Sequence, residues 1–432
     1  MHSFHYRDTR LFCDEVDVAT VAEKFGTPLY LYSAGTILDH FQRLDSALTG
    51  LERLVCYAVK ANSNRAILRL LAEAGAGFDI VSGGELFRVL KAGGDPAKCT
   101  FAGVGKSREE IEYALEQGVY SFNIESEAEL AYINEIASAK NRRAPIALRL
   151  NPDVDAHTHS YISTGKSENK FGIALEHAAA VYARAAAMSA ITIRGVQMHI
   201  GSQITEAAPF VAALEKISPL IAELKTKYAI EFCSIGGGLG IAYESSIASG
   251  SGDWWSAQQS RPLTIADYAD AILPALKKIG LRILLEPGRL LVGNAGILLT
   301  RVRYAKETAH KKFAIVDAGM NDLIRPALYG SFHEIVPVRQ RSAARAKIDI
   351  VGPVCESGDF FAQEREMPEV RAGDLLAIMS AGAYGFVMAS NYNSRPLPAE
   401  ALVRGGEVAL IRERQTLDDL VRGEVDPNFG QD

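Results

Sequence analysis

The chain has 432 residues, with 46 Lys and Arg against 52 Asp and Glu, which gives a formal net charge of −6 at pH 7. This length favours two domains over a single core, and the scattered charge without a basic tail disfavours nucleic-acid binding. No apolar run approaches the ~18 residues of a membrane span, and the N-terminus lacks the pattern of a secretion signal. We therefore expect a cytoplasmic protein with no membrane association.

The N-terminal stretch, residues 1–32, alternates like short strands around one short helix. Eight strand-like runs then follow between about residues 53 and 290, each next to a helix-like stretch. This alternation predicts a (β/α)₈ barrel of the TIM type over residues 33–290. The eight runs are "LVCYAVKAN", "GFDIVS", "CTFAG", "YSFNIES", "IALRLNP", "GVQMHIGS", "CSIGGG" and "RILLEPG".

After residue 290 the sequence becomes rich in β-like segments with few helical repeats between them. We expect residues 291–432, together with 1–32, to form a mostly antiparallel β domain. The segment 246–262, with Ser, Gly and two Trp, is predicted to be a surface loop insertion. The five cysteines are odd in number, widely spread and free of C-x-x-C spacing, which disfavours a disulfide framework or a zinc site.

Polar motifs stand at the ends of four predicted barrel strands: Lys60, His199, the glycines of 236–238 and the "EPGR" of 286–289. In such a barrel these ends meet at one mouth. A lysine there would lose hydration as a cation, which favours a lowered pKa and Schiff-base chemistry. Exposed glycine N–H groups suit a phosphate, and a glutamate suits a pyridine nitrogen. The combination predicts pyridoxal 5′-phosphate.

Each of these motifs also has an ordinary structural explanation when it is taken alone. Lys60 could be a surface residue with a buried stem, the triple glycine a tight turn, and His199 a satisfied core histidine. Glu286 and Arg289 could form an ion pair at the barrel rim. The coincidence of all four motifs at strand ends favours the cofactor site.

The ordered motifs resemble the alanine racemase-like, fold-type III pyridoxal phosphate decarboxylases, and within that family the branch that acts on diaminopimelate. The resemblance runs from about residue 57 to 385. It implies decarboxylation of meso-2,6-diaminopimelate at its D-centre to L-lysine and CO₂, the last step of lysine biosynthesis. The matching stretches are "YAVKAN", "GFDIVSGGEL", "HTHSYISTGKSENKFGI", "HIGSQ", "GGGLG", "LLEPGR", "DAGMNDLIRPALYG", "GPVCESGD" and "AGAYG".

The same resemblance implies a role for each site residue. Lys60 would hold the cofactor aldehyde, His199 would stack on the ring and Glu286 would bond the pyridine nitrogen. The phosphate would be held by Ser202, Gly236, Gly237, Gly238 and the backbone of the loop with Gly288 and Arg289. Substrate binding is implied for Arg289, Arg325, Tyr329 and Tyr384, the last also touching the cofactor.

In "CESGD", residues 355–359, the resemblance makes Cys355 the proton donor and Glu356 the residue that recognises the substrate's distal amine. Both would enter the site from the partner subunit, which implies a homodimer with shared active sites. Without the resemblance, Cys355 could be a small buried hydrophobe, as free cysteines usually are, although the flanking Glu356 and Asp359 weigh against this.

Several alternatives stay open at this point. The substrate could be ornithine, arginine, carboxynorspermidine or a carrier-linked glutamyl group, although related ornithine and arginine enzymes tend to have Asp where Glu356 stands. A racemase is disfavoured, since racemases of this fold place an arginine against the pyridine nitrogen. A silent binding homologue would be expected to have lost Lys60 or Cys355. His157 and His159 have no acidic or cysteine partner at ligand spacing, so we expect no metal site and place them on the loop that resembles the family's active-site lid.

Overall fold

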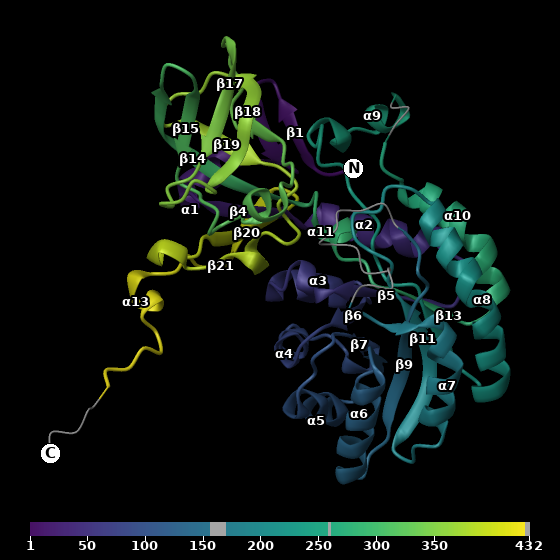
Figure 1. The fold of residues 1–432 in the computed structure, drawn as a ribbon. Coiled ribbons are helices and arrows are strands. Elements are labelled where there is room, and N and C mark those ends of the chain that lie inside the picture. Colours follow the sequence, from purple (N-terminus) through teal and green to yellow (C-terminus); the bar gives the residue numbers. More distant parts are fainter. Residues whose placement is uncertain (156–169, 258–260, 428–432) are drawn as a thin grey trace, which may run out of the picture. The chain divides into compact units, whose positions relative to one another are not determined.

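The computed structural model describes residues 1–155, 170–257 and 261–427, and the chain forms two compact units (Figure 1). The first unit contains Met1–His2, Ala34–Ala295 and Gly382–Val387. The second contains Ser3–Ser33, Gly296–Ala381 and the chain from Met388 onward. The short return Gly382–Val387 matters because it brings Tyr384 into the first unit.

The first unit is built around a closed ring of eight parallel strands. Each strand pairs with the next, and the last returns to the first, so the predicted (β/α)₈ barrel is confirmed. A two-residue strand, β10 (Ile173–Ala174), pairs with the C-terminal end of β9, at Leu150 and Asn151. In ring order the strands are β5 (Arg53–Ala58), β6 (Gly77–Ile80), β7 (Cys99–Phe101), β8 (Ser121–Ile124), β9 (Ala144–Asn151), β11 (Ile191–Met198), β12 (Phe232–Ser234) and β13 (Arg282–Leu285).

Helices alternate with these strands along the chain and lie around the ring (Figure 1). Local sequence explains their starts, because Ser107 and Thr264 form capping boxes at α5 and α10. α3 buries Ile67, Leu68, Leu70 and Leu71 on one face. The helices are α2 (Ala34–Ala47), α3 (Arg65–Glu73), α4 (Gly83–Lys91), α5 (Arg108–Gln117), α6 (Glu127–Ala139), α7 (Leu175–Ala186), α8 (Ala208–Tyr228), α9 (Gly252–Ala257), α10 (Ile265–Ile279) and α11 (Arg289–Val292).

Of the predicted surface loop 246–262, the structure describes residues 246–257 and 261–262, most of which are exposed or half-buried. This loop contains helix α9, and the Trp255 indole N–H donates to the carbonyl oxygen of Ser249 at 2.7 Å. The Trp254 and Trp255 rings meet edge to face with centroids 5.0 Å apart. The described part of this loop therefore contains a short helix and a pair of half-buried tryptophans.

The barrel interior changes character along its strands. An apolar cluster made by Leu54, Cys56, Tyr120, Ala147, Phe232 and Leu284 fills one part of it. Buried polar side chains lie in the second half of their strands or just beyond: Asp79, Asn123, Gln197, Ser234 and Glu286. The carboxyl ends of the strands therefore carry a polar layer, which is where a barrel places its active site.

The second unit contains a sheet with the strand order β18-β17-β15-β14-β4-β20-β21. Two more strands belong to it: β19 pairs with β14, and β16 pairs with β19. Its pairings are antiparallel except β15–β17 and β20–β4, which confirms a mostly antiparallel domain. The strands are β4 (Leu29–Ser33), β14 (Gly296–Glu307), β15 (Lys312–Val316), β16 (Ile335–Pro337), β17 (Arg345–Val351), β18 (Phe360–Pro368), β19 (Leu375–Ile378), β20 (Ala399–Arg404) and β21 (Glu407–Arg412).

The same unit holds a small antiparallel sheet and three short helices. The small sheet is formed by β1 (Phe4–Arg7), β2 (Arg10–Cys13) and β3 (Val16–Asp17). The helices are α1 (Val18–Phe25), α12 (Arg325–Tyr329) and α13 (Leu417–Leu420).

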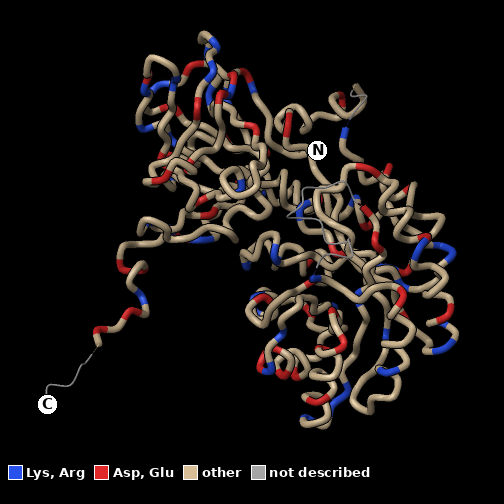
Figure 2. The backbone as a smooth tube through the Cα atoms, in the orientation of Figure 1, with Lys and Arg blue, Asp and Glu red and all other residues tan. Residues whose placement is uncertain are grey.

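Charges of both signs are mixed along the tube in each unit, as Figure 2 shows. Within the part of the chain that the structure describes, no helix is both long and apolar enough to cross a lipid bilayer. All five cysteines are free; four are buried and Cys355 is exposed.

Candidate active site

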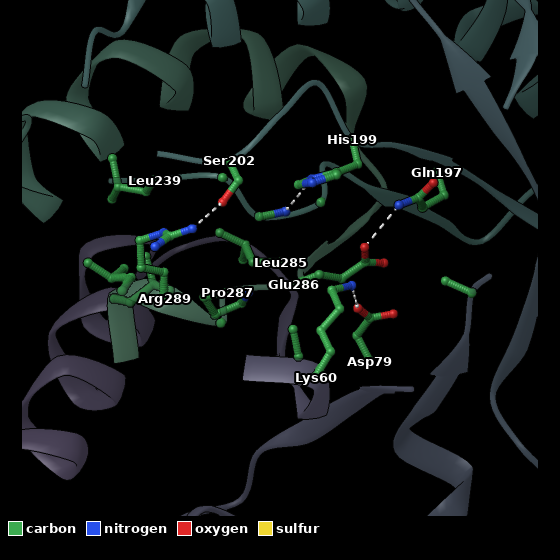
Figure 3. Close-up of a pocket in the computed structure, with 18 of the residues that line it drawn as sticks. Lys60, Asp79, Gln197, His199, Ser202, Leu239, Leu285, Glu286, Pro287 and Arg289 are labelled. Atoms are coloured by element: carbon green, nitrogen blue, oxygen red, sulfur yellow. Dashed lines mark hydrogen bonds and ion pairs between the residues drawn. The ribbon is translucent and has the colours of Figure 1, made fainter. Parts of the chain in front are cut away.

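One pocket of the first unit lies at the carboxyl ends of the barrel strands and brings many of the predicted residues together (Figure 3). Asp79, Arg149 and Gln197, which the sequence did not single out, line it as well. Among the described residues, no group of His, Cys, Asp and Glu is arranged to hold a metal ion. The predicted residues in its lining are Lys60, His199, Ser202, Gly236, Gly237, Gly238, Glu286, Gly288, Arg289 and Tyr384.

Lys60 lies in a 3₁₀ turn, Val59–Ala61, directly after β5, and its Nζ is 2.8 Å from Asp79 Oδ2. Burial lowers the pKa of the amine, but the Asp79 charge and hydrogen bond outweigh it and raise the pKa above the ordinary value. The expected lowering of the Lys60 pKa is therefore wrong. The Lys60 side chain is 41% exposed to solvent, so its cationic form also remains hydrated.

We predict that Asp79→Asn lowers the pKa of Lys60, because it removes the negative charge closest to the amine. At a fixed neutral pH a larger fraction of Lys60 would then be neutral and able to attack an aldehyde. The rate at which the cofactor-free protein condenses with pyridoxal phosphate, followed by absorbance across pH, should reach its half-maximum at lower pH. Asp270→Asn, on the exposed face of α10, is the matched control and should leave the profile unchanged.

Glu286 follows β13 and is almost fully buried, with 6% of its surface exposed. Burial raises the pKa of its carboxyl group and the Asp79 charge adds to the rise, while hydrogen bonds from Ser234 and Gln197 oppose it. Ser234 Oγ and Asn123 Nδ2 donate to Oε1 at 2.7 and 3.4 Å, and Gln197 Nε2 donates to Oε2 at 2.9 Å. Three strands thus hold one carboxylate.

The glycines of 236–238 are required by close backbone contacts. A Cβ at Gly236 would lie 2.5 Å from the carbonyl oxygen of Met198, and one at Gly238 would lie 2.5 Å from that of Gly201. A Cβ at Gly237 would overlap the carbonyl oxygen of Glu286. Only glycine lets these loops approach, and the resulting concave stretch of bare backbone is the kind that binds phosphate.

Arg289 begins α11 and joins several parts of the pocket. Its Nη2 donates to Ser202 Oγ at 3.0 Å, its Nη1 donates to the Tyr243 hydroxyl, and its guanidinium lies 4.9 Å from the centre of the Tyr384 ring. The Tyr384 backbone adopts a left-handed conformation, φ 55°, and its N–H donates to the carbonyl oxygen of Ala61 at 2.8 Å. Ser202 and Tyr384 are therefore both tied to the neighbourhood of Lys60.

His199 directly follows β11, and its Nδ1 accepts the backbone N–H of Gly237 at 3.3 Å. Burial lowers the pKa of the imidazole, and the positive charges of Arg149 and Lys60 lower it further. The ring is therefore neutral, which suits stacking on a flat ligand better than donating a proton.

Four predicted residues belong to the second unit and are described there. Cys355 and Glu356 are exposed, and the Glu356 carboxylate accepts a hydrogen bond from the Tyr392 hydroxyl at 2.9 Å. Arg325 is buried and donates to Ser331 Oγ at 3.2 Å, while Tyr329 ends α12 half-buried. His157 and His159 lie outside the described residues.

The last residue of the "CESGD" stretch has a structural task. Asp359 accepts the backbone N–H groups of Val354 and Met320, both at 2.6 Å. These two bonds close the loop that presents Cys355. The carboxylate of Asp359 therefore orders the motif, and Cys355 and Glu356 are its exposed functional groups.

The chain matches the family model described as the pyridoxal binding domain of pyridoxal-dependent decarboxylases over residues 34–293. It is 51% identical over 425 residues to the diaminopimelate decarboxylase of Pseudomonas aeruginosa, covering 98% of this chain and 99% of that one. It is 46% identical to that of Vibrio cholerae, covering 97% and 98%. Among solved structures, diaminopimelate decarboxylase from M. jannaschii in complex with L-lysine has a TM-score of 0.90 at 40% identity, with 98% of each chain covered.

Proposed function

This chain belongs to the pyridoxal-dependent decarboxylases, and from that premise we infer that it converts meso-2,6-diaminopimelate to L-lysine and CO₂ by removing the carboxylate at the D-centre. The reaction is the last step of lysine biosynthesis, and the cofactor is pyridoxal 5′-phosphate. The observation that supports it most directly is the pocket in which Lys60, Glu286 and the glycines of 236–238 meet.

The residues of this pocket fit the cofactor. Lys60 would bond to its aldehyde, the bare backbone of 236–238 with Ser202 and Gly288 would hold its phosphate, and the buried Glu286 carboxylate would face its pyridine nitrogen. When bound, pyridoxal phosphate supplies a protonated ring that accepts the electrons left behind by departing CO₂. Neutral His199 would cover one ring face without competing for the proton.

The chain's own groups then handle charge and protons. An ionised Glu286, favoured by the hydrogen bonds from Ser234 and Gln197, would hold a negative charge beside the ring nitrogen and favour protonation of that nitrogen. Asp79 would stabilise the ammonium form of Lys60, since Lys60 Nζ lies 2.8 Å from Asp79 Oδ2. Arg289, which contacts Ser202 and the Tyr384 ring, would anchor phosphate or a substrate carboxylate through its guanidinium.

The second half of the site is proposed to come from another copy of the chain. From that copy, Cys355 would protonate the substrate carbon and Glu356 would bind the distal amine. The exposed positions of Cys355 and Glu356 support this, because both groups are available to a partner. Arg325 and Tyr329 are proposed separately, as substrate-binding residues. The active unit would be a homodimer, and an exposed working thiol suits the reducing cytoplasm.

The test is CO₂ release from meso-diaminopimelate by the purified protein with added pyridoxal phosphate. Ornithine, arginine and carboxynorspermidine are run in parallel, and an absorption spectrum is taken before substrate is added. We expect a cofactor band and turnover of diaminopimelate alone. A cofactor band with turnover of one of the other amino acids instead would keep the family and overturn the substrate.

A further inference from the structure

The two oxygens of the Glu286 carboxylate are held unequally. Oε1 accepts from Ser234 and Asn123, whereas Oε2 accepts from Gln197 at 2.9 Å. Among the described residues Gln197 is the only donor to Oε2. Loss of Ser234 would leave Oε1 with one donor, but loss of Gln197 would leave Oε2 with none.

Gln197 also differs from the other two donors in its position. Gln197 and Glu286 line the pocket, whereas Ser234 and Asn123 are buried and are not among the lining residues (Figure 3). The contact between Gln197 and Glu286 is therefore part of the pocket lining. The contacts from Ser234 and Asn123 to the other oxygen are made by residues outside that lining.

The carbonyl oxygen of the Gln197 amide argues against a role in packing alone. Gln197 is 2% exposed, and its Oε1 has no hydrogen-bond partner in the part of the chain that the structure describes. An apolar side chain of the same size would avoid burying that oxygen without a partner. Among the described residues, the amide's hydrogen bond goes to Glu286.

From these observations we propose that Gln197 is a positioning residue for the reaction: its amide orients the Glu286 carboxylate and keeps it charged toward the cofactor's ring nitrogen. This inference rests on the proposed function. It adds a determinant located on β11, in the strand interior two residues before His199. Gln197 need not touch the reacting atoms, since it acts through Glu286.

The test compares two ligands in the full-length protein: pyridoxal phosphate and its analogue in which the ring nitrogen is replaced by carbon. For Gln197→Met we expect the dissociation constant of pyridoxal phosphate to rise roughly tenfold, as for loss of one hydrogen bond to a charged group. The dissociation constant of the analogue should stay within about twofold, because it has no nitrogen for Glu286 to hold. Thr100→Val, which removes a buried hydroxyl that has no hydrogen-bond partner among the described residues, should change neither constant.

Equal weakening of both ligands would show that Gln197 only shapes the pocket, and unchanged binding of both would show that it does nothing there; each result overturns the inference. If Gln197→Met does not fold, Gln197→Glu carries the same comparison, because it keeps the size and sets a second carboxyl against Oε2. A wild-type chain that binds neither ligand would overturn the proposed function itself. Selective binding by the wild type that persists in the variants would overturn the role of Gln197 alone.

Discussion

Lys60→Ala is expected to remove decarboxylase activity completely, because no other amine among the described pocket residues can hold the cofactor aldehyde. Cys355→Ala is expected to lose most activity as well, since the proposed proton donor is gone. Neither variant should act alone. Mixed in equal amounts so that subunits assort freely, they should recover about a quarter of the wild-type rate if each site takes Lys60 from one chain and Cys355 from its partner.

The fraction follows from counting sites. Random assortment makes about half of the dimers mixed, and each mixed dimer has one site with both groups and one with neither. Co-expression with two different affinity tags isolates the mixed dimers and allows their rate to be measured directly. A mixed dimer that is as inactive as its parents would mean that Lys60 and Cys355 do not serve one site across two chains.

The position of the site was predictable because its functional side chains follow the ends of strands. Lys60, His199 and Glu286 each come directly after an apolar run, and a barrel gathers such ends at one mouth. The same reasoning could not give the charge state of Lys60. Its controlling partner, Asp79, is 19 residues away on the neighbouring strand, and only the pairing of β5 with β6 brings the two together.

The residues that hold Glu286 were missed for a related reason. Asn123, Gln197 and Ser234 belong to strands, in the stretches "SFNI", "GVQM" and "FCSI", where most of the neighbouring residues are apolar. A signal did exist, since a polar side chain in a fully buried strand needs a hydrogen-bond partner. The sequence does not say which partner, because the three strands converge on one carboxylate only after the ring has closed.

Glu286→Gln is expected to lower kcat by roughly 10²–10³-fold, the loss typical when one preorganised charge-stabilising group is removed. The amide has the shape of the carboxylate but not its charge, so it no longer favours a protonated ring nitrogen. It also sets an NH₂ group among donors: Ser234 and Asn123 at one oxygen position, or Gln197 at the other. Lys60 should still bind the cofactor, so the variant should keep the cofactor absorption band while its kcat is low.

Two further variants separate the charge of Glu286 from its mere presence. Glu286→Asp keeps the charge on a shorter stem, so it should recover part of the rate if charge is what matters. Glu85→Gln is the matched control, because burial also raises the pKa of Glu85, to about 7, and among the described residues its carboxylate accepts the backbone N–H of Val81, at 2.8 Å. It should stay within a few-fold of the wild type. If Glu286→Gln did so too, the polar layer at the strand ends would serve folding rather than catalysis, and the three donors would need another explanation.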